Sequence, residues 1–153
     1  MNISKFIVLQ RAKCVICNEN VYGRVTESYK NGFFSWFKTN DGNMTLVDTN
    51  TVCSFVGTTT TDGTQVFEGD IVNIKSNKLF EDVAVNDIFL VTYNKKHGAF
   101  CLFNKNGKFD EIGPDTLNFC LDDHYFESTV LGNIYDNPEL IEGWKEPEEE
   151  IDV

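Results

Sequence analysis

Two cysteines three positions apart, in the stretch Cys14-Val15-Ile16-Cys17, are the side chains with the most evident chemical potential in this sequence. Structural zinc takes four Cys or His ligands, commonly from two such pairs, and the sequence holds no second CxxC. Val15 and Ile16 favour an extended strand, on which residues three apart point to opposite faces. We therefore expect buried free thiols here, ahead of a zinc site or a redox pair, and no bound cofactor.

The other candidate metal ligands are scattered along the chain and would complete a zinc site only by a coincidence of folding. They are Cys53, Cys101, Cys120, His97 and His124. We expect the purified protein to carry no stoichiometric zinc by elemental analysis. Five cysteines, an odd number without regular spacing, fit reduced thiols in a cytosol better than a disulfide framework.

The stretch Glu68-Gly69-Asp70 places two carboxylates at a bend, directly before an apolar alternation that begins at Ile71. A general acid–base pair would need a cleft and a third group, and both histidines lie in other segments. Glycine permits the turn, and carboxylates at such corners accept backbone N–H bonds. We interpret these residues as a bend that begins a strand. Gly-rich phosphate loops followed by a helix, HExxH and GxSxG do not occur, and we expect no enzyme activity.

Strands must position these residues, because helical periodicity is nearly absent and the apolar runs are short, β-branched or aromatic, and bounded by turn formers. The expected strands are Phe6–Leu9, Lys13–Cys17, Val21–Thr26, Gly32–Lys38, Met44–Asp48, Thr51–Val56, Asp70–Lys75, Asp87–Tyr93, Ala99–Asn104, Phe109–Ile112, Thr116–Leu121 and Ser128–Tyr135. Tight turns are expected at 40–43, 62–63, 94–98 and 104–107. This spacing is typical of an all-β sandwich or a small barrel. One short helical turn is expected after Asn137 as the cap, with Pro138 first and Gly143 as the stop.

The aromatic stretch GFFSWFK predicts a strand with two apolar faces. Phe33, Ser35 and Phe37 fall on one face, and Phe34 and Trp36 fall on the other. One face packs in the core, and the other meets a second layer or a partner. Burial of both faces is the simpler interpretation. The alternative makes Phe34 and Trp36 candidate partner-binding or oligomer residues.

The net charge of −11 comes from the end of the chain, since residues 110–153 carry 14 acidic residues and one basic residue, Lys145. No Lys/Arg cluster of the kind that grips nucleic acid is visible, so direct nucleic-acid binding is not expected. A solvated surface and tail is the simpler interpretation of the acidity. The alternative is mimicry, in which Asp122, Asp123 and other carboxylates imitate phosphates in a host protein's nucleic-acid groove. No apolar run is long enough for a membrane span, and no signal peptide is expected.

Two stretches, CSFVGTTTTDGTQVFEGDIVNI and STVLGNIYDNPELI, closely resemble the YopX family of phage and prophage proteins, and LVTYNKKHGAFCLF between them matches the family's paired strands. The matching residues of the first stretch are Phe55, Gly57, Asp62, Gly63, Phe67, Glu68, Gly69, Asp70, Ile71 and Val72. Those of the second stretch are Gly132, Asn133, Ile134, Tyr135, Asp136, Asn137, Pro138, Glu139 and Leu140. The resemblance covers about residues 53–142, whereas residues 1–52 match poorly.

The resemblance implies a mostly β fold with a small SH3-like barrel, structural roles for the motif residues, no enzyme activity and a place in the host bacterial cytosol. We expect an N-terminal β extension at 1–52, as part of the same domain or as a subdomain, a YopX-like domain at 53–143 and an acidic tail at 144–153. The expected function is binding to an unknown host or phage protein. In the concrete version, the protein inhibits a host protein that handles nucleic acid or acts in defence. A nucleotide-sequestering protein and a purely structural oligomeric module are the alternatives.

Overall fold

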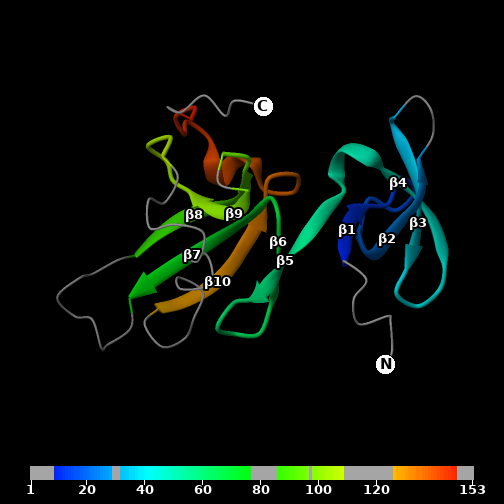
Figure 1. Cartoon of the computed structure of the whole chain (residues 1–153), viewed down its shortest axis with the longest axis horizontal. Coiled ribbons are helices and arrows are strands. Elements are labelled where there is room, and N and C mark those ends of the chain that lie inside the picture. Colours follow the sequence, from blue (N-terminus) through cyan, green and yellow to red (C-terminus); the bar gives the residue numbers. More distant parts are fainter. Residues whose placement is uncertain (1–8, 29–31, 77–85, 97, 109–125, 148–153) are drawn as a thin grey trace. The chain divides into compact units, whose positions relative to one another are not determined.

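Antiparallel strands dominate the computed structural model, which describes residues 9–28, 32–76, 86–96, 98–108 and 126–147 (Figure 1). The chain divides into two units, Met1–Phe55 and Val56–Val153, where the sequence suggested a boundary between residues 52 and 53. The described residues form two antiparallel sheets, which confirms the mostly β prediction. Neither sheet closes into a barrel within these ranges, and the SH3-like barrel stays a prediction. No helix in the described ranges has the length and apolar character to cross a membrane.

The first unit is a curled sheet. Its elements are β1 (Gln10–Lys13), β2 (Asn20–Ser28), β3 (Phe34–Thr39), β4 (Met44–Asp48), the 3-10 helix η2 (Thr49–Thr51) and the start of β5 (Cys53–Thr59). The strand order is β4-β3-β2-β1-β5, and β5 continues into the second unit, where it pairs with β6 (Gln65–Phe67). Beyond β1, Cys14 bridges to Val47 of β4, and the Val15 N–H donates to the Leu46 carbonyl at 2.9 Å. The sheet therefore curls until the end of β1 meets β4.

Alternation along β3 puts the core of the first unit on one side of the sheet. Ser35 and Phe37 are fully buried, whereas Phe34 is exposed and Trp36 is half-buried. The buried cluster consists of Ala12, Phe37 and Val47, with Val21, Val25 and Val52 packed against it. The predicted alternation is confirmed for residues 34–37. The prediction for Phe33 is wrong, because this residue precedes β3 and is 62% exposed instead of sharing the buried side with Phe37.

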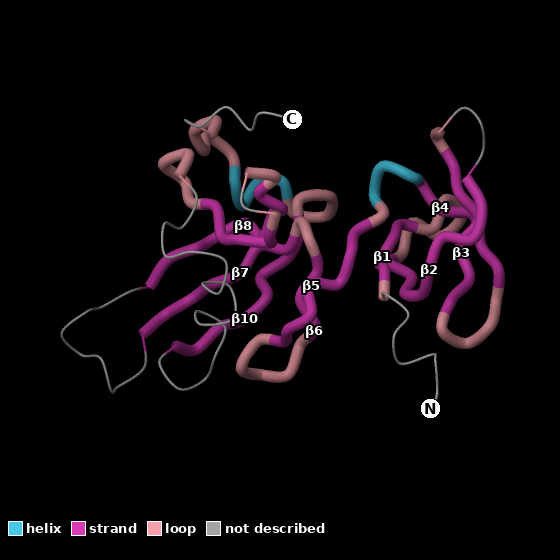
Figure 2. Tube along the Cα trace, in the orientation of Figure 1, coloured by secondary structure: helices cyan, strands magenta, loops and turns pink. Residues whose placement is uncertain are grey.

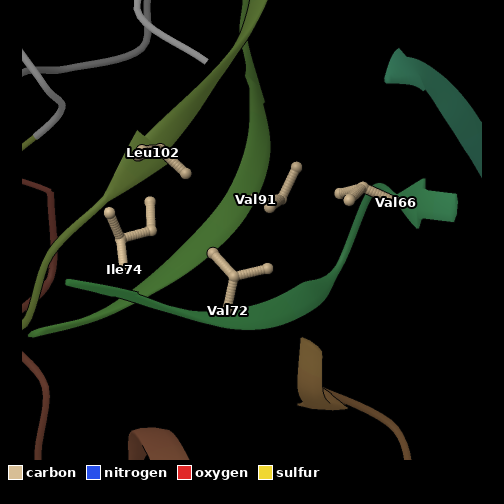
Figure 3. Close-up of a cluster of buried hydrophobic side chains, with 5 residues drawn as sticks. All are labelled: Val66, Val72, Ile74, Val91 and Leu102. Carbon is tan, nitrogen blue, oxygen red and sulfur yellow. The ribbon is translucent and has the colours of Figure 1, made fainter. Parts of the chain in front are cut away.

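The second unit is built on a sheet with the order β10-β7-β8-β9 (Figure 2). Its further elements are β7 (Asp70–Ser76), β8 (Asn86–Asn94), β9 (Ala99–Phe103), β10 (Phe126–Asn133) and the 3-10 helix η4 (Pro138–Ile141). The register places Val91 of β8 opposite Leu102 of β9. Figure 3 shows these two side chains pointing toward Val72 and Ile74 of β7 and Val66 of β6, and all five are at most 1% exposed. The β5–β6 hairpin thus supplies the layer that covers this side of the sheet.

Three tight turns share one geometry, and the sequence predicts all three. In each turn the first residue donates its N–H to the carbonyl of the fifth, at 2.8 Å for 39–43, 2.8 Å for 60–64 and 2.9 Å for 104–108. The fourth residue is Gly42, Gly63 or Gly107, with φ of 90°, 86° and 80°. Glycine adopts this left-handed conformation without a steric penalty, which explains why Asp-Gly and Asn-Gly pairs locate these turns so well.

Other sequence predictions have mixed outcomes. The strand expected at Lys13–Cys17 is wrong, because β1 ends at Lys13 and Val15–Cys17 form a turn. The sequence does not predict β6, which is only 3 residues long. The strands expected at Phe109–Ile112 and Thr116–Leu121 lie outside the described residues, as do most of Phe6–Leu9 and the side chains His97, Cys120 and His124.

Candidate functional site

Apolar side chains collect on the solvent side of the first unit's sheet, over β3 and β4. Phe34 is 39% exposed and Met44 is 51% exposed, and Trp36 and Leu46 are half-buried. Trp36 lies directly opposite Leu46 in the β3–β4 register, so these two side chains share the same side of the sheet. We call Phe34, Trp36, Met44 and Leu46 the outer face.

Charged residues border the outer face. Lys38 lies opposite Met44 on β4 and opposite Arg24 on β2, and both cationic side chains are exposed. Two acidic residues also border the outer face, since Glu27 lies opposite Trp36 on β2 and Asp48 lies opposite Phe34 on β4. An apolar centre with a charged rim is the composition found in protein interfaces.

The sequence predicts only part of the outer face. It singles out Phe34 and Trp36, and the structure brings both together with Met44 and Leu46, which the sequence analysis missed. Two features of the sequence could have predicted them. The alternation of residues 44–48 puts Met44 and Leu46 on one side of β4, and the turn at Asp41 and Gly42 determines which β4 residues lie opposite Trp36.

The bend before β7 is a folding device. The Asp70 carboxylate is 1% exposed and accepts the N–H of Phe67 at 2.8 Å. Gly69 has φ of 89°, donates its N–H to the Val91 carbonyl at 2.8 Å and accepts the Ile134 N–H at 3.0 Å. The prediction that a carboxylate at this bend accepts a backbone N–H across the turn is confirmed.

The second motif stretch forms a tight loop held by two asparagines. Oδ1 of Asn133 accepts the N–H groups of Tyr135 at 2.9 Å and Asp136 at 3.0 Å. The Asn137 N–H donates to the Asn133 carbonyl at 2.8 Å, and Oδ1 of Asn137 accepts the Asn133 N–H at 3.4 Å. A Cβ on Gly132 would lie 2.2 Å from that Oδ1. Asn137 occupies the cap position of η4, but its side chain makes no cap hydrogen bond, so the predicted side-chain cap is wrong.

The remaining motif residues also lie in the framework of the second unit. Gly57 has φ of 91° inside β5, and Gly63 has φ of 86° in the β5–β6 turn. Phe67 is 2% exposed, Pro138 is the first residue of η4, and Glu68 is half-buried. Their placement associates these positions with bends and packing.

Cys14 and Cys17 lie in a turn. The Asn18 N–H donates to the Cys14 carbonyl at 3.0 Å, and Asn18 has φ of 57°. Hydrogen bonds from the Thr45 hydroxyl, 3.4 Å from Cys14 Sγ, and then from the Cys17 amide and thiol lower the pKa of the Cys14 thiol to about 7. The expectation of two sulfurs on opposite strand faces is therefore wrong, and Cys17 is exposed where a buried thiol was expected. Among the described residues, no group of three or more His, Cys, Asp or Glu side chains could hold a metal ion.

The acidic candidates Asp122 and Asp123 lie outside the described residues, so mimicry by these two side chains stays a prediction. The start of the expected solvated tail contacts the second unit instead. The Trp144 ring lies 6.4 Å from the Phe103 ring, and the amide that follows it donates to the Lys105 carbonyl at 3.1 Å. The expectation of a solvated tail is therefore wrong at its first residue, because Trp144 contacts Phe103 of β9.

Comparisons with known proteins relate this chain to a family through both units. A solved structure, the crystal structure of protein EF1440 from Enterococcus faecalis, matches 89% of this chain and 99% of its own, with a TM-score of 0.51 and 19% identity, which shows a similar fold. No functionally curated protein matches. The family model described as YopX protein matches residues 5–142, and so includes most of the N-terminal stretch that the sequence motifs left unmatched. This chain therefore belongs to the YopX family.

Proposed function

We propose that this protein is a non-enzymatic binding protein that recognises another protein through the outer face of its first unit. The observation that carries the proposal is the exposure of large apolar side chains there, 39% for Phe34 and 51% for Met44, beside Trp36 and Leu46. Each Å² of apolar surface moved out of water stabilises a complex by about 25 cal/mol before the costs of association. A partner that covered the outer face would gain this free energy.

The composition of the outer face favours a protein partner over a nucleic acid. Tryptophan in a central, desolvated position is among the residues that contribute most to protein–protein affinity. Arg24 and Lys38 supply two cations at the rim, whereas nucleic acid is held by a longer run of them. Because Glu27 and Asp48 border the outer face as well, the rim of the partner's surface is expected to carry charges of both signs.

The YopX family supports a phage or prophage setting, with action in the cytosol of the bacterial host. In the concrete version of the proposal, the protein inhibits a host protein that handles nucleic acid or acts in defence. The 14 acidic residues of 110–153 support this version, because carboxylates compete with phosphates for a basic groove. Such a contact weakens as added salt screens the charges, whereas an apolar contact does not.

The test is affinity purification of the tagged full-length chain from the bacterial host at two salt concentrations, followed by mass spectrometry. Trp36→Ala should reduce recovery of the partner at least about tenfold, as expected for a residue at the centre of an interface. Leu131→Ala is the matched control, because Leu131 is an apolar residue of the second unit that is 44% exposed. Undiminished recovery by Trp36→Ala, or equal loss with both variants, contradicts the proposal.

A second copy of the chain is the other occupant that the outer face could fit, since a twofold dimer uses the same patch on both subunits. Light scattering separates the two cases. A lower mass for Trp36→Ala or Phe34→Ala, with little change in melting temperature, supports self-association. If both variants lower the melting temperature to the same extent and leave the mass unchanged, Phe34 and Trp36 serve the fold alone. That result contradicts both the partner-binding and the self-association versions of the proposal. A rise in melting temperature with one member of a nucleotide panel would instead favour the small-ligand alternative.

For the second unit we retain the small SH3-like barrel as a proposal. Two β layers around one core support it, because Val66 of the β5–β6 hairpin packs on Val72 and Val91 of the four-stranded sheet. Hydrogen bonds between Thr61 and Ser128 also tie this hairpin to β10, with the Thr61 hydroxyl donating to the Ser128 carbonyl at 3.1 Å. An experimental structure that includes residues 109–125 tests whether the strands close.

A further inference from the structure

The turn at Cys14–Cys17 holds a chemical group that the proposed function does not use. The Thr45 hydroxyl lies 3.4 Å from Cys14 Sγ, and hydrogen bonding from Thr45 and from the backbone of Cys17 lowers the pKa of the Cys14 thiol to about 7. Donors around a sulfur stabilise the thiolate relative to the thiol. The curled sheet creates this arrangement, because the bridge from Cys14 to β4 carries Thr45 to the turn.

The two sulfurs of the turn differ in access to solvent. Cys17 is exposed, whereas Cys14 is only 6% exposed and bridges to Val47 of β4. The other described cysteines are buried, with Sγ of Cys53 3.2 Å from the Thr51 carbonyl oxygen and Sγ of Cys101 positioned similarly over a carbonyl. Cys14 and Cys17 differ from these two cysteines because they share one turn and because one of them is exposed.

We propose that Cys14 and Cys17 form a reversible dithiol–disulfide site whose oxidants are low-molecular-weight disulfides. The exposed Cys17 thiolate attacks one sulfur of the disulfide RSSR, which forms a mixed disulfide and releases RS⁻ to take up the proton that Cys17 lost. The Cys14 thiolate then attacks Cys17 Sγ, closes the Cys14–Cys17 disulfide and releases a second RS⁻, which takes up the proton from Cys14. Two protein thiols are oxidised, and one RSSR is reduced to two RSH.

The geometry fits this order of steps. Access decides the first step, and Cys17 is the sulfur that an external disulfide can reach. Proximity decides the second step, because Cys14 and Cys17 flank a single turn, which the Asn18 N–H closes by donating to the Cys14 carbonyl at 3.0 Å. The low pKa of Cys14 supplies a large thiolate fraction for that step near neutral pH. The inference is independent of the outer face and stands or falls separately from the proposed function.

The experiment uses the reduced full-length chain, freed of metal with EDTA and incubated with oxidised glutathione at neutral pH. The remaining thiols are then alkylated and located by tryptic mapping. Cleavage after Lys13 and Arg24 isolates a peptide that contains Cys14 and Cys17 and no other cysteine. The expected result is that this peptide has lost two hydrogens and is not alkylated. Cys53 and Cys101 should still be free thiols, and they should therefore be alkylated once the chain is unfolded.

Three variants identify the steps, each checked for folding by circular dichroism. Cys14→Ser should stop at one glutathione on Cys17, and Cys17→Ser should form neither the adduct nor the closed disulfide. Thr45→Val should slow closure near pH 7 and recover the rate at higher pH, which a purely structural role of Thr45 would not cause. A persistent glutathione adduct in the unmodified chain, full alkylation of both cysteines, or one zinc per chain that resists EDTA overturns the inference.

Discussion

Gly132→Ala is the substitution that most directly tests whether the second family motif is a folding device. A Cβ at position 132 would lie 2.2 Å from Oδ1 and 2.6 Å from Cγ of Asn137, far inside contact distance. The backbone at Gly132 is not in the left-handed region, so the penalty is steric and comes from one neighbouring side chain. Removing that side chain with Asn137→Gly should therefore remove the penalty.

The expected size follows from the contacts. Overpacking typically costs about 1–3 kcal/mol. Replacing glycine by alanine returns about 0.4–1 kcal/mol through the unfolded chain, which leaves a net loss of about 1–2 kcal/mol for Gly132→Ala. Asn137→Gly alone should cost about 1–2 kcal/mol, because it removes the 3.4 Å acceptor of the Asn133 N–H and adds backbone freedom. In the double variant, Gly132→Ala becomes neutral or slightly stabilising, so the coupling free energy is about 1–3 kcal/mol.

The assay is urea denaturation of the four chains of this cycle, followed by the fluorescence of Trp144. The chain has 2 tryptophans, so Trp36→Phe in all four chains leaves the indole that packs on Phe103 as the only reporter, inside the same unit as the motif. A coupling below about 0.5 kcal/mol would mean that the two sites act independently. That result would refute the steric account of Gly132.

Two further predictions concern carboxylates. Asp70→Asn should destabilise the second unit by about 1–3 kcal/mol in urea denaturation, because the buried Phe67 N–H loses its carboxyl acceptor. Glu68→Gln at the same bend should change stability by less than about 0.5 kcal/mol, and similar effects of the two substitutions would contradict the assignment. Hydrogen bonds from the hydroxyl of Thr60 and from Thr64 lower the pKa of Asp62 below its ordinary 3.8. The ionised Asp62 therefore stabilises the folded state above pH 3.8, and this contribution is lost as the pH falls through the lower pKa of the folded state. The melting temperature of Asp62→Asn should fall less than that of the unmodified chain between about pH 4 and pH 2, and parallel curves would contradict this linkage.

Local signals in the sequence were sufficient for the turns and for the bend before β7. Glycine in the left-handed region, as at Gly42 and Gly63, and a carboxylate that reaches a nearby amide, as at Asp70, depend on residues a few positions apart. The alternation of Phe34 to Phe37 is local in the same sense. Such features were predicted because short-range sterics and hydrogen bonding determine them.

The errors arose where a hydrogen bond of the folded chain overrode the local preference of a residue. Val15 and Ile16 have strand propensity, but the Val15 N–H bonds to β4 and Asn18 adopts a left-handed conformation, so the chain turns there. The Asn137 side chain can cap a helix, but here its Oδ1 accepts the Asn133 N–H and makes no cap hydrogen bond to η4. At Val15 a long-range hydrogen bond outweighs the strand propensity, whereas at Asn137 a hydrogen bond to a residue four positions earlier in the same loop replaces the helix cap. Membership of the outer face likewise depends on the β3–β4 register.

The two units present different kinds of evidence about function. Asp70 and Gly132, two family-motif residues of the second unit, are engaged in the fold: Asp70 is buried and bonded to the backbone, and Gly132 is too close to Asn137 for any larger side chain. Loss of activity after changes at these positions would report unfolding. Trp36 on the outer face and Cys17 in the exposed turn can be changed at little cost to the core of Phe37 and its neighbours. Functional experiments on this protein should therefore begin in the first unit, where an effect on binding or thiol chemistry can be separated from an effect on stability.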